Sequence, residues 1–237
     1  MNSRLLIGLI IVLLAMSCKD NEERPMPVVE EKVEVEKKID LDEFYQPMIT
    51  EDGDTLLSYI PQDSVELFFT RYGKKNPEKR VEIETKYGKI QLELFEQTPL
   101  YRASFIYLVK NGYYDETVVH RVVPDFIVQA GDSDRRITAT KRSSAGNYML
   151  PPAILDNVQH TYGTVSAAKR WEDNPENWHN PFDFFITLGS ASHLDGEHTI
   201  FGKVTSGMDV AEKISRLNRD EGDWPIETVY IDMKVID

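Results

Sequence analysis

Short segments in which apolar and polar residues alternate recur from residue 81 to the C-terminus. Val81–Thr85 and Ile90–Leu94 flank the turn Lys86-Tyr87-Gly88-Lys89, which predicts a hairpin with one buried face. Further short strands are expected at 118–123, 126–130, 163–168, 182–188, 199–204 and 228–235. Eight such strands favour a mainly β fold that closes into an antiparallel barrel.

Two helices are expected to cap this barrel. The first begins at Thr98-Pro99, because proline suits the first helical position, and ends at Asn111-Gly112. The second is expected over 208–217. No internal repeat accompanies these elements.

Residues 40–80 are predicted to form an N-terminal extension with one short helix. Asp52-Gly53-Asp54 indicates a turn. Asp63 is expected to cap a helix over 64–72, and Gly73 is a natural stop for it. We expect this helix to pack on the main domain, with no chemistry of its own.

The first residues of the chain have the pattern of a targeting signal. Arg4 precedes the apolar run Leu5–Ala15, which is too short to cross a hydrocarbon core of about 30 Å. The run ends at Ala15-Met16-Ser17-Cys18, and Cys18 is the only cysteine. This resembles a bacterial lipobox, which implies removal of residues 1–17 and lipidation of Cys18. The alternative is a plain secretory signal with an unmodified cysteine.

Residues 18–39 are expected to be a disordered tether, because the segment after Cys18 is dense in charge and has no aromatic residue. The tether would hold a folded domain away from a membrane to which only the lipid is bound. Its acidic start also resembles a surface-export signal of some bacterial lipoproteins, and a solvated spacer is the equal alternative. The predicted location is therefore the bacterial cell envelope, periplasmic or surface-exposed.

Charge and histidine spacing exclude several functions. The chain has 40 acidic and 27 basic residues and a formal net charge of −13, which argues against a nucleic-acid partner. The five histidines lack the spacing of a metal site, so neither a metal nor another cofactor is expected. His160 and His179 are expected to be loop residues, and His120 to be structural.

Residues 119–132 read VHRVVPDFIVQAGD and place a cation and an amide in an apolar strand. The stretch resembles the cyclophilin signature FHRVIPxFMxQGGD. Three further segments resemble motifs of the same family in the same order, namely GTVSAA at 163–168, FFI at 184–186 and LDGEHTIFGKV at 194–204. The resemblance covers residues 81–237 and implies a cyclophilin-like domain, expected to be monomeric.

The resemblance implies peptidyl-prolyl cis–trans isomerase activity on proline-containing segments of client proteins. Arg121 would donate to the prolyl nitrogen, Phe126 would hold the proline ring, and Gln129 would bind the substrate backbone and help to position Arg121. These three are the expected catalytic residues. Substrate contacts are expected from Ile127, Ala168, Lys169, Asp183, Phe185, His193, Leu194 and His198.

Asp183 departs from the family pattern, which usually has glutamine before Phe-Phe. It shares a strand face with Phe185, so its carboxylate is expected to point toward Arg121. There it would either orient the guanidinium or neutralise it.

Two further departures concern the rim of the expected groove. His193 replaces an aromatic residue on which cyclosporin binding in the family depends, which implies weak binding of this drug. Lys169 replaces a usual asparagine or arginine, and the following loop over 169–182 is longer than in the family. That loop is either a lid over the groove or a tucked surface insertion.

Two functions therefore compete. One is an active prolyl isomerase that assists the folding of exported or envelope proteins. The other is a proline-peptide-binding or chaperone-like module with weak or no turnover, which Asp183 and the long loop favour.

Overall fold

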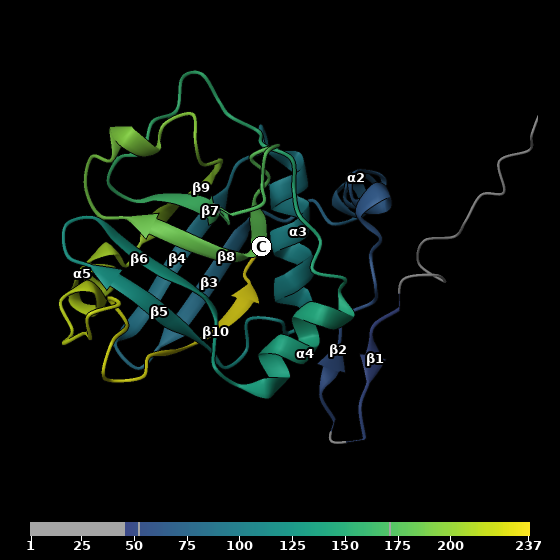
Figure 1. The fold of residues 1–237 in the computed structure, drawn as a ribbon, viewed down its shortest axis with the longest axis horizontal. Helices are drawn as coiled ribbons and strands as arrows, with labels where there is room; N and C mark the ends of the chain where they lie inside the picture. The colour runs from purple at the N-terminus through teal and green to yellow at the C-terminus, as the bar shows by residue number, and fades with distance from the viewer. Residues whose placement is uncertain (1–45, 52, 171) are drawn as a thin grey trace, which may run out of the picture. The chain divides into compact units, whose positions relative to one another are not determined.

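Eight antiparallel strands close into a barrel, as the alternating pattern predicts (Figure 1). The order around the barrel is β10-β3-β4-β9-β7-β8-β6-β5, and β5 pairs with β10 to close it. The strands are β3 (Arg80–Thr85), β4 (Gly88–Leu94), β5 (Thr117–Val123), β6 (Ile127–Asp132), β7 (Thr164–Ala168), β8 (Asn180–Thr187), β9 (Ile200–Ser206) and β10 (Tyr230–Val235). The predicted fold class is confirmed.

The computed structural model describes residues 46–51, 53–170 and 172–237. The predicted signal sequence, the lipidated Cys18 and the tether all lie outside the described residues. Within the described part of the chain, no helix has the length and apolar character needed to cross a membrane.

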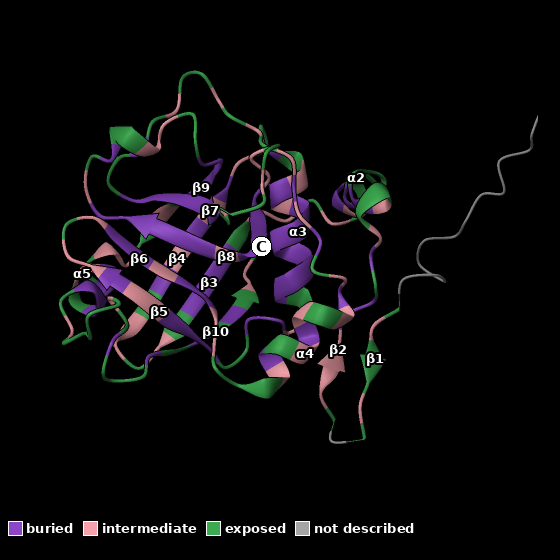
Figure 2. Cartoon of the chain, in the orientation of Figure 1, coloured by how far each residue is buried: buried purple, intermediate pink, exposed green. Residues whose placement is uncertain are grey.

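Side-chain alternation builds the barrel core. In β4, Ile90, Leu92 and Leu94 are buried, whereas Gln91 and Glu93 between them are only partly buried. The same rule holds around the barrel, because successive residues of a strand point to opposite faces of the sheet. Figure 2 shows the buried positions along the strands and along α3.

The two predicted capping helices are present on opposite sides of the barrel (Figure 1). Helix α5 (Met208–Ser215) contacts β4, β5 and β6. Helix α3 (Pro99–Lys110) has proline at its start, as expected, and contacts β8 and β10. It is buried on more than one face, because a further helix covers the side that faces away from the barrel.

That further helix is α2 (Val65–Lys75), which belongs to the N-terminal extension and follows a 3₁₀ turn at Gln62–Ser64. Phe68 and Phe69 pack their rings on Tyr107 of α3, with centroid separations of 5.4 and 5.8 Å. The extension therefore shares its apolar core with the barrel domain.

The predicted start of α2 is correct to within one residue, but its predicted cap and its predicted end are wrong. Asp63 does not cap the helix, since its carboxylate accepts a hydrogen bond from the Ser64 hydroxyl at 3.1 Å. Gly73 does not end it either. A Cβ at Gly73 would lie 3.0 Å from the Cβ of Ala103, so glycine allows α2 and α3 to approach closely, and the helix continues to Lys75.

Two small elements complete the fold. Strands β1 (Met48–Ile49) and β2 (Thr55–Leu56) form a hairpin around the turn predicted near Gly53. Helix α4 (Arg136–Ser144) is an element that the sequence did not predict. It buries only Thr138 and Lys141 and has no apolar stripe from which periodicity could identify it.

Candidate active site

Strand register brings three of the predicted site residues into one row across the outer face of the barrel. Arg121 of β5 lies opposite Gln129 of β6, and Gln129 lies opposite Phe185 of β8. Ser166 of β7 continues the row beyond Phe185. A cation, an amide and an aromatic ring thus stand side by side on neighbouring strands.

Aromatic and imidazole rings surround this row. Phe126, in the turn between β5 and β6, lies 5.3 Å from the ring of His193. Phe185 meets the edge of His198 at 5.2 Å and stacks on His160 at 6.0 Å. The rings expected around a proline therefore come from four separate segments of the chain.

The remaining predicted wall residues lie in the same part of the fold. Ile127 is buried at the start of β6, and Leu194 is half-buried in the 3₁₀ turn η2 (Ser192–Leu194). His198 fixes its ring by a 2.9 Å contact between Nδ1 and the Ala167 carbonyl oxygen. Burial lowers the pKa of His198 to about 4, so the ring is neutral at physiological pH.

Ala168 and Lys169 lie where β7 ends. The Lys169 side chain is almost fully buried and donates to Glu197 at 2.6 Å and to Asn177 at 2.5 Å. These contacts tie the start of the long loop to the turn that follows Leu194. Within the loop, the Asn174 side chain accepts from Trp178 N at 2.9 Å. These hydrogen bonds favour the interpretation of the 169–182 loop as a tucked surface insertion rather than as a lid over the groove.

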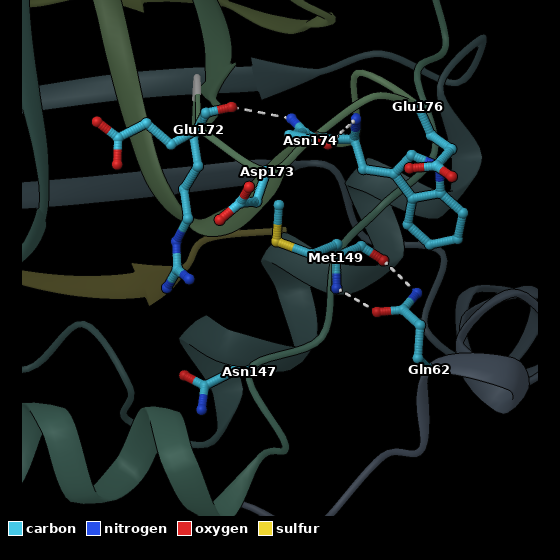
Figure 3. A pocket seen from close by; sticks show the side chains of 9 residues that line it. Gln62, Asn147, Met149, Glu172, Asp173, Asn174 and Glu176 are labelled. Carbon is cyan, nitrogen blue, oxygen red and sulfur yellow. Dashed lines mark hydrogen bonds between the residues drawn. The ribbon is translucent and has the colours of Figure 1, made fainter.

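A hollow of about 860 Å³ lies between this loop and the N-terminal extension (Figure 3). On the extension side, Gln62 Nε2 donates to the Met149 carbonyl at 3.0 Å, and Met149 N donates to Gln62 Oε1 at 2.8 Å. The N-terminal extension thus forms part of the lining of this hollow. The lining residues are Gln62, Asn147, Met149, Arg170, Glu172, Asp173, Asn174, Glu176 and Trp178.

The prediction that the Asp183 carboxylate points toward Arg121 is wrong. Its Oδ1 lies 2.7 Å from Nη2 of Arg142, and its Oδ2 accepts from Asn180 Nδ2 at 2.8 Å. Burial raises the pKa of Asp183, and the adjacent guanidinium opposes that shift. The carboxylate therefore pairs with helix α4, which the sequence did not predict.

Arg121 instead pairs with Asp223, a residue that the sequence did not single out. Nε of Arg121 lies 3.4 Å from Oδ2 of Asp223, and Arg219 Nε lies 3.1 Å from the other carboxylate oxygen. The Asp223 carbonyl accepts from Val122 N at 2.9 Å, which fixes the loop beside β5. No local pattern identifies such a partner, because it depends on the path of the loop between α5 and β10.

The histidines outside the row are more buried than expected. His160 and His179 lie outside the strands, as predicted for loop residues, but both are buried. His160 Nδ1 is 2.8 Å from Asp195 Oδ1, and His179 Nδ1 is 2.8 Å from the Tyr101 hydroxyl. His120 packs on Trp224 at 5.8 Å. The described residues contain no cluster of three metal-ligating side chains.

Residues 80–235 match the family described as cyclophilin type peptidyl-prolyl cis-trans isomerase/CLD. The chain belongs to this family. As a cyclophilin, it is 39% identical over 155 residues to the peptidyl-prolyl cis-trans isomerase ppi1 of Schizosaccharomyces pombe, covering 64% of this chain and 94% of that protein. It is 37% identical over 162 residues to isomerase CYP18-2 of Arabidopsis thaliana, covering 66% and 93%.

Solved cyclophilin structures agree with this assignment. A cyclophilin type isomerase of Cryptosporidium parvum, solved in the presence of the dipeptide Ala-Pro, superposes with a TM-score of 0.57 and 28% identity. The match covers 67% of this chain and 99% of that one. The cyclophilin part accounts for the barrel, and the extension that supplies α2 precedes the residues matched to the family.

Proposed function

We propose that this cyclophilin isomerises X–Pro bonds in exported or envelope proteins, with Arg121 as the catalytic donor. The observation that carries the proposal is the row formed by Arg121, Gln129 and Phe185 on the outer face of the barrel. The Arg121 side chain is 42% exposed, so its guanidinium is accessible to a bound peptide. The Ala-Pro dipeptide used with the Cryptosporidium relative supports a proline-containing substrate.

The reaction needs no covalent intermediate. Amide resonance sets a barrier of ~18–20 kcal/mol to rotation about a peptide bond. As the X–Pro amide twists, the lone pair localises on the prolyl nitrogen, where a hydrogen-bond donor stabilises it. A guanidinium aimed at that nitrogen therefore binds the transition state more strongly than the ground state, which is the condition for catalysis.

The other residues of the site would hold the substrate while the bond rotates. Phe126, Phe185 and His198 offer ring faces and edges against which a proline ring can pack. Gln129, between Arg121 and Phe185, has both a donor and an acceptor for the peptide backbone. These contacts would hold the proline ring in place while the carbonyl group of the preceding residue rotates about the X–Pro bond.

An isomerisation assay on the full-length chain in detergent tests this assignment. Arg121→Ala is expected to lower kcat/KM by about 100-fold, the usual loss when one preorganised donor is removed. Arg80→Ala is the matched control, because Arg80 is a comparably exposed arginine of the same barrel. Equal rates for wild type and Arg121→Ala would refute the catalytic role.

A proline-peptide-binding module with weak or no turnover is the alternative outcome. It predicts that wild-type protein binds an Ala-Pro-containing peptide but does not accelerate its isomerisation. The pairing of Asp183 with Arg142 favours the enzyme, because the carboxylate expected to restrain Arg121 is engaged elsewhere.

For the location, we propose a lipid-anchored protein of the bacterial envelope, monomeric and without a nucleic-acid partner. The support is the lipobox-like sequence ending at Cys18 and the acidic segment that follows it. Cys18→Ala should release the protein from the membrane fraction of the producing cells, whereas Ser17→Ala should not. Unchanged membrane association of Cys18→Ala would contradict the anchor.

A further inference from the structure

We propose that Arg142 is a positioning residue of the active site, which binds the carboxylate of Asp183 and thereby keeps it from pairing with Arg121. The inference rests on the proposed catalytic role of Arg121. It assigns a function to helix α4, which the sequence did not predict.

Asp183 lies on the face of the barrel that carries the site. Phe182 and Phe184 point into the core from β8, so the alternating residues Asp183 and Phe185 point outward. Two strand spacings separate β8 from β5, and Arg121 is level with Phe185 rather than with Asp183, so about 12 Å separates the backbones of Arg121 and Asp183. A long, flexible arginine side chain can cross most of this distance to reach an unpaired carboxylate.

Arg142 binds the Asp183 carboxylate in the structure and, together with Asn180, leaves no oxygen of it unpaired for Arg121. Its Nη2 lies 2.7 Å from Asp183 Oδ1, while Asn180 donates to Oδ2 at 2.8 Å, so both oxygens are bound. The two charged side chains are only 14% and 13% exposed. Charges this poorly hydrated need a partner, because losing water without one is unfavourable.

Arg142 is itself held in place. Its Nε and Nη2 donate to the Tyr113 hydroxyl at 3.2 and 3.0 Å, and Nη1 lies 3.3 Å from Asp132 Oδ2. The guanidinium also lies over the ring of Phe182, 5.3 Å from its centroid. Neighbouring Lys141 anchors the helix by donating to the Gly112 carbonyl at 2.7 Å. The cation is therefore preorganised beside Asp183.

The two arginines thus have separate acidic partners. Arg142 pairs with Asp183, and Arg121 pairs with Asp223. Without Arg142, a poorly hydrated negative charge would remain on the catalytic face, and Arg121 is a cation of the same face. If the Arg121 guanidinium bound Asp183, some of its N–H donors would be occupied. It would also point away from the prolyl nitrogen of the substrate.

This arrangement predicts an unusual pH dependence for Arg142→Gln. The charged and titratable groups that face Asp183 are Arg142 from α4, Asp132 from β6, His120 from β5 and Tyr113 from the segment after α3. Burial raises the pKa of Asp183, and removing Arg142 removes the main opposing charge. Burial lowers the pKa of His120, so its protonation is not the step that we invoke. Protonation of Asp183 would release Arg121, so activity should recover as the pH falls.

The test compares kcat/KM in the full-length chain at pH 8 and pH 5.5. Arg142→Gln is expected to lower kcat/KM about tenfold at pH 8 and by a smaller factor at pH 5.5. In an Asp183→Asn background, Arg142→Gln should change the rate by less than about twofold. Arg136→Gln is the matched control, because Arg136 is an exposed arginine of the same helix.

Three outcomes would overturn the proposal. They are a wild-type rate for folded Arg142→Gln at pH 8, a loss that persists when Asp183 is neutral, and a loss that is as large at pH 5.5 as at pH 8. Should Arg142→Gln fail to fold, Arg142→His carries a charge that raising the pH removes, and its rate should fall as the pH rises.

A crystal structure of Arg142→Gln separates this proposal from the proposed function. If the wild type is inactive, the catalytic assignment fails, yet the position of Arg121 still decides the inference. We expect the guanidinium to have left Asp223 for Asp183. Arg121 still paired with Asp223, and Asp183 without a cation, would refute the positioning role.

Discussion

Arg121 and Asp223 form an ion pair in which the arginine Nε lies 3.4 Å from the aspartate Oδ2. This contact draws the guanidinium of Arg121 toward the loop that carries Asp223. Arg219 binds the other oxygen of Asp223 at 3.1 Å and holds the carboxylate in turn. The loop before β10 therefore orients the residue that we assign to catalysis.

Replacing Asp223 by asparagine should impair catalysis more than folding. A partly exposed ion pair contributes only ~0.2–1 kcal/mol to stability, so the melting temperature should change little. Loss of orientation should lower kcat about tenfold, equivalent to about 1.4 kcal/mol of transition-state stabilisation, with KM within about twofold. The measurement is steady-state isomerisation kinetics together with thermal unfolding.

Glu221→Gln is the control for this change, since Glu221 is an exposed acid of the same loop. It should retain the wild-type kcat. If Asp223→Asn and Glu221→Gln lower kcat equally, the effect is one of net charge, and the orienting role of Asp223 is wrong.

Stability should fall as the pH drops from 6.5 toward 4. Burial lowers the pKa values of His179 and His198 from about 6.5 to about 4 in the folded state. Between these values the unfolded chain binds more protons than the folded one, so protonation favours unfolding. Each histidine should contribute a slope of about 1.4 kcal/mol per pH unit.

Urea unfolding at pH 7, 6 and 5 measures this slope. His179→Gln should reduce the slope by less than half, because burial also lowers the pKa values of His120 and His160. A free energy of unfolding that does not decrease between pH 6.5 and 5 would contradict neutral, buried histidines.

Phe69→Ala should destabilise the protein by about 3–5 kcal/mol, the usual cost of removing a buried phenylalanine. Phe69 is 1% exposed and packs its ring on Tyr148 at 5.2 Å as well as on Tyr107. Leu67→Ala on the same helix should cost less than about 0.5 kcal/mol, because Leu67 is 52% exposed. Similar unfolding midpoints for the two variants would show that α2 is dispensable for the fold.

Gly131→Ala should prevent the pairing of β6 with β8. A Cβ at this position would lie 2.2 Å from the Phe182 carbonyl oxygen, and the backbone has a φ of +111°. Gly196→Ala provides a comparison, since Gly196 has a φ of +80° but no atom within 4 Å of its Cβ position. The second variant should lose only about 1–2 kcal/mol from its left-handed backbone. Recovery of folded Gly131→Ala at wild-type stability would exclude this steric account.

Much of the barrel was predictable because its information is local. Ile90, Leu92 and Leu94 alternate with polar residues, and that period alone selects a strand with one buried face. Helix α4 was missed for the same reason, since its two buried residues, Thr138 and Lys141, give no apolar period. Gly73 was predicted to end the helix. The structure instead places it inside α2, where the absence of a side chain allows close packing against α3.

The candidate site also combines features that the sequence predicts with features that only the fold determines. The cyclophilin-like motifs identified Arg121, Gln129 and Phe185, and strand register then placed them in one row. The sequence also determined that Asp183 shares a face with Phe185, because alternation is a property of the strand itself.

Only the tertiary structure decided which charges pair. Asp183 binds Arg142 and Arg121 binds Asp223, and in both pairs the partner comes from a different element that the fold brings alongside. An ion pair depends on the distance between charges in space, and no periodicity along the chain encodes that distance. The sequence therefore determined the barrel and the position of Arg121 on it, while the packing of α4 and of the loop before β10 decided which charges surround that arginine.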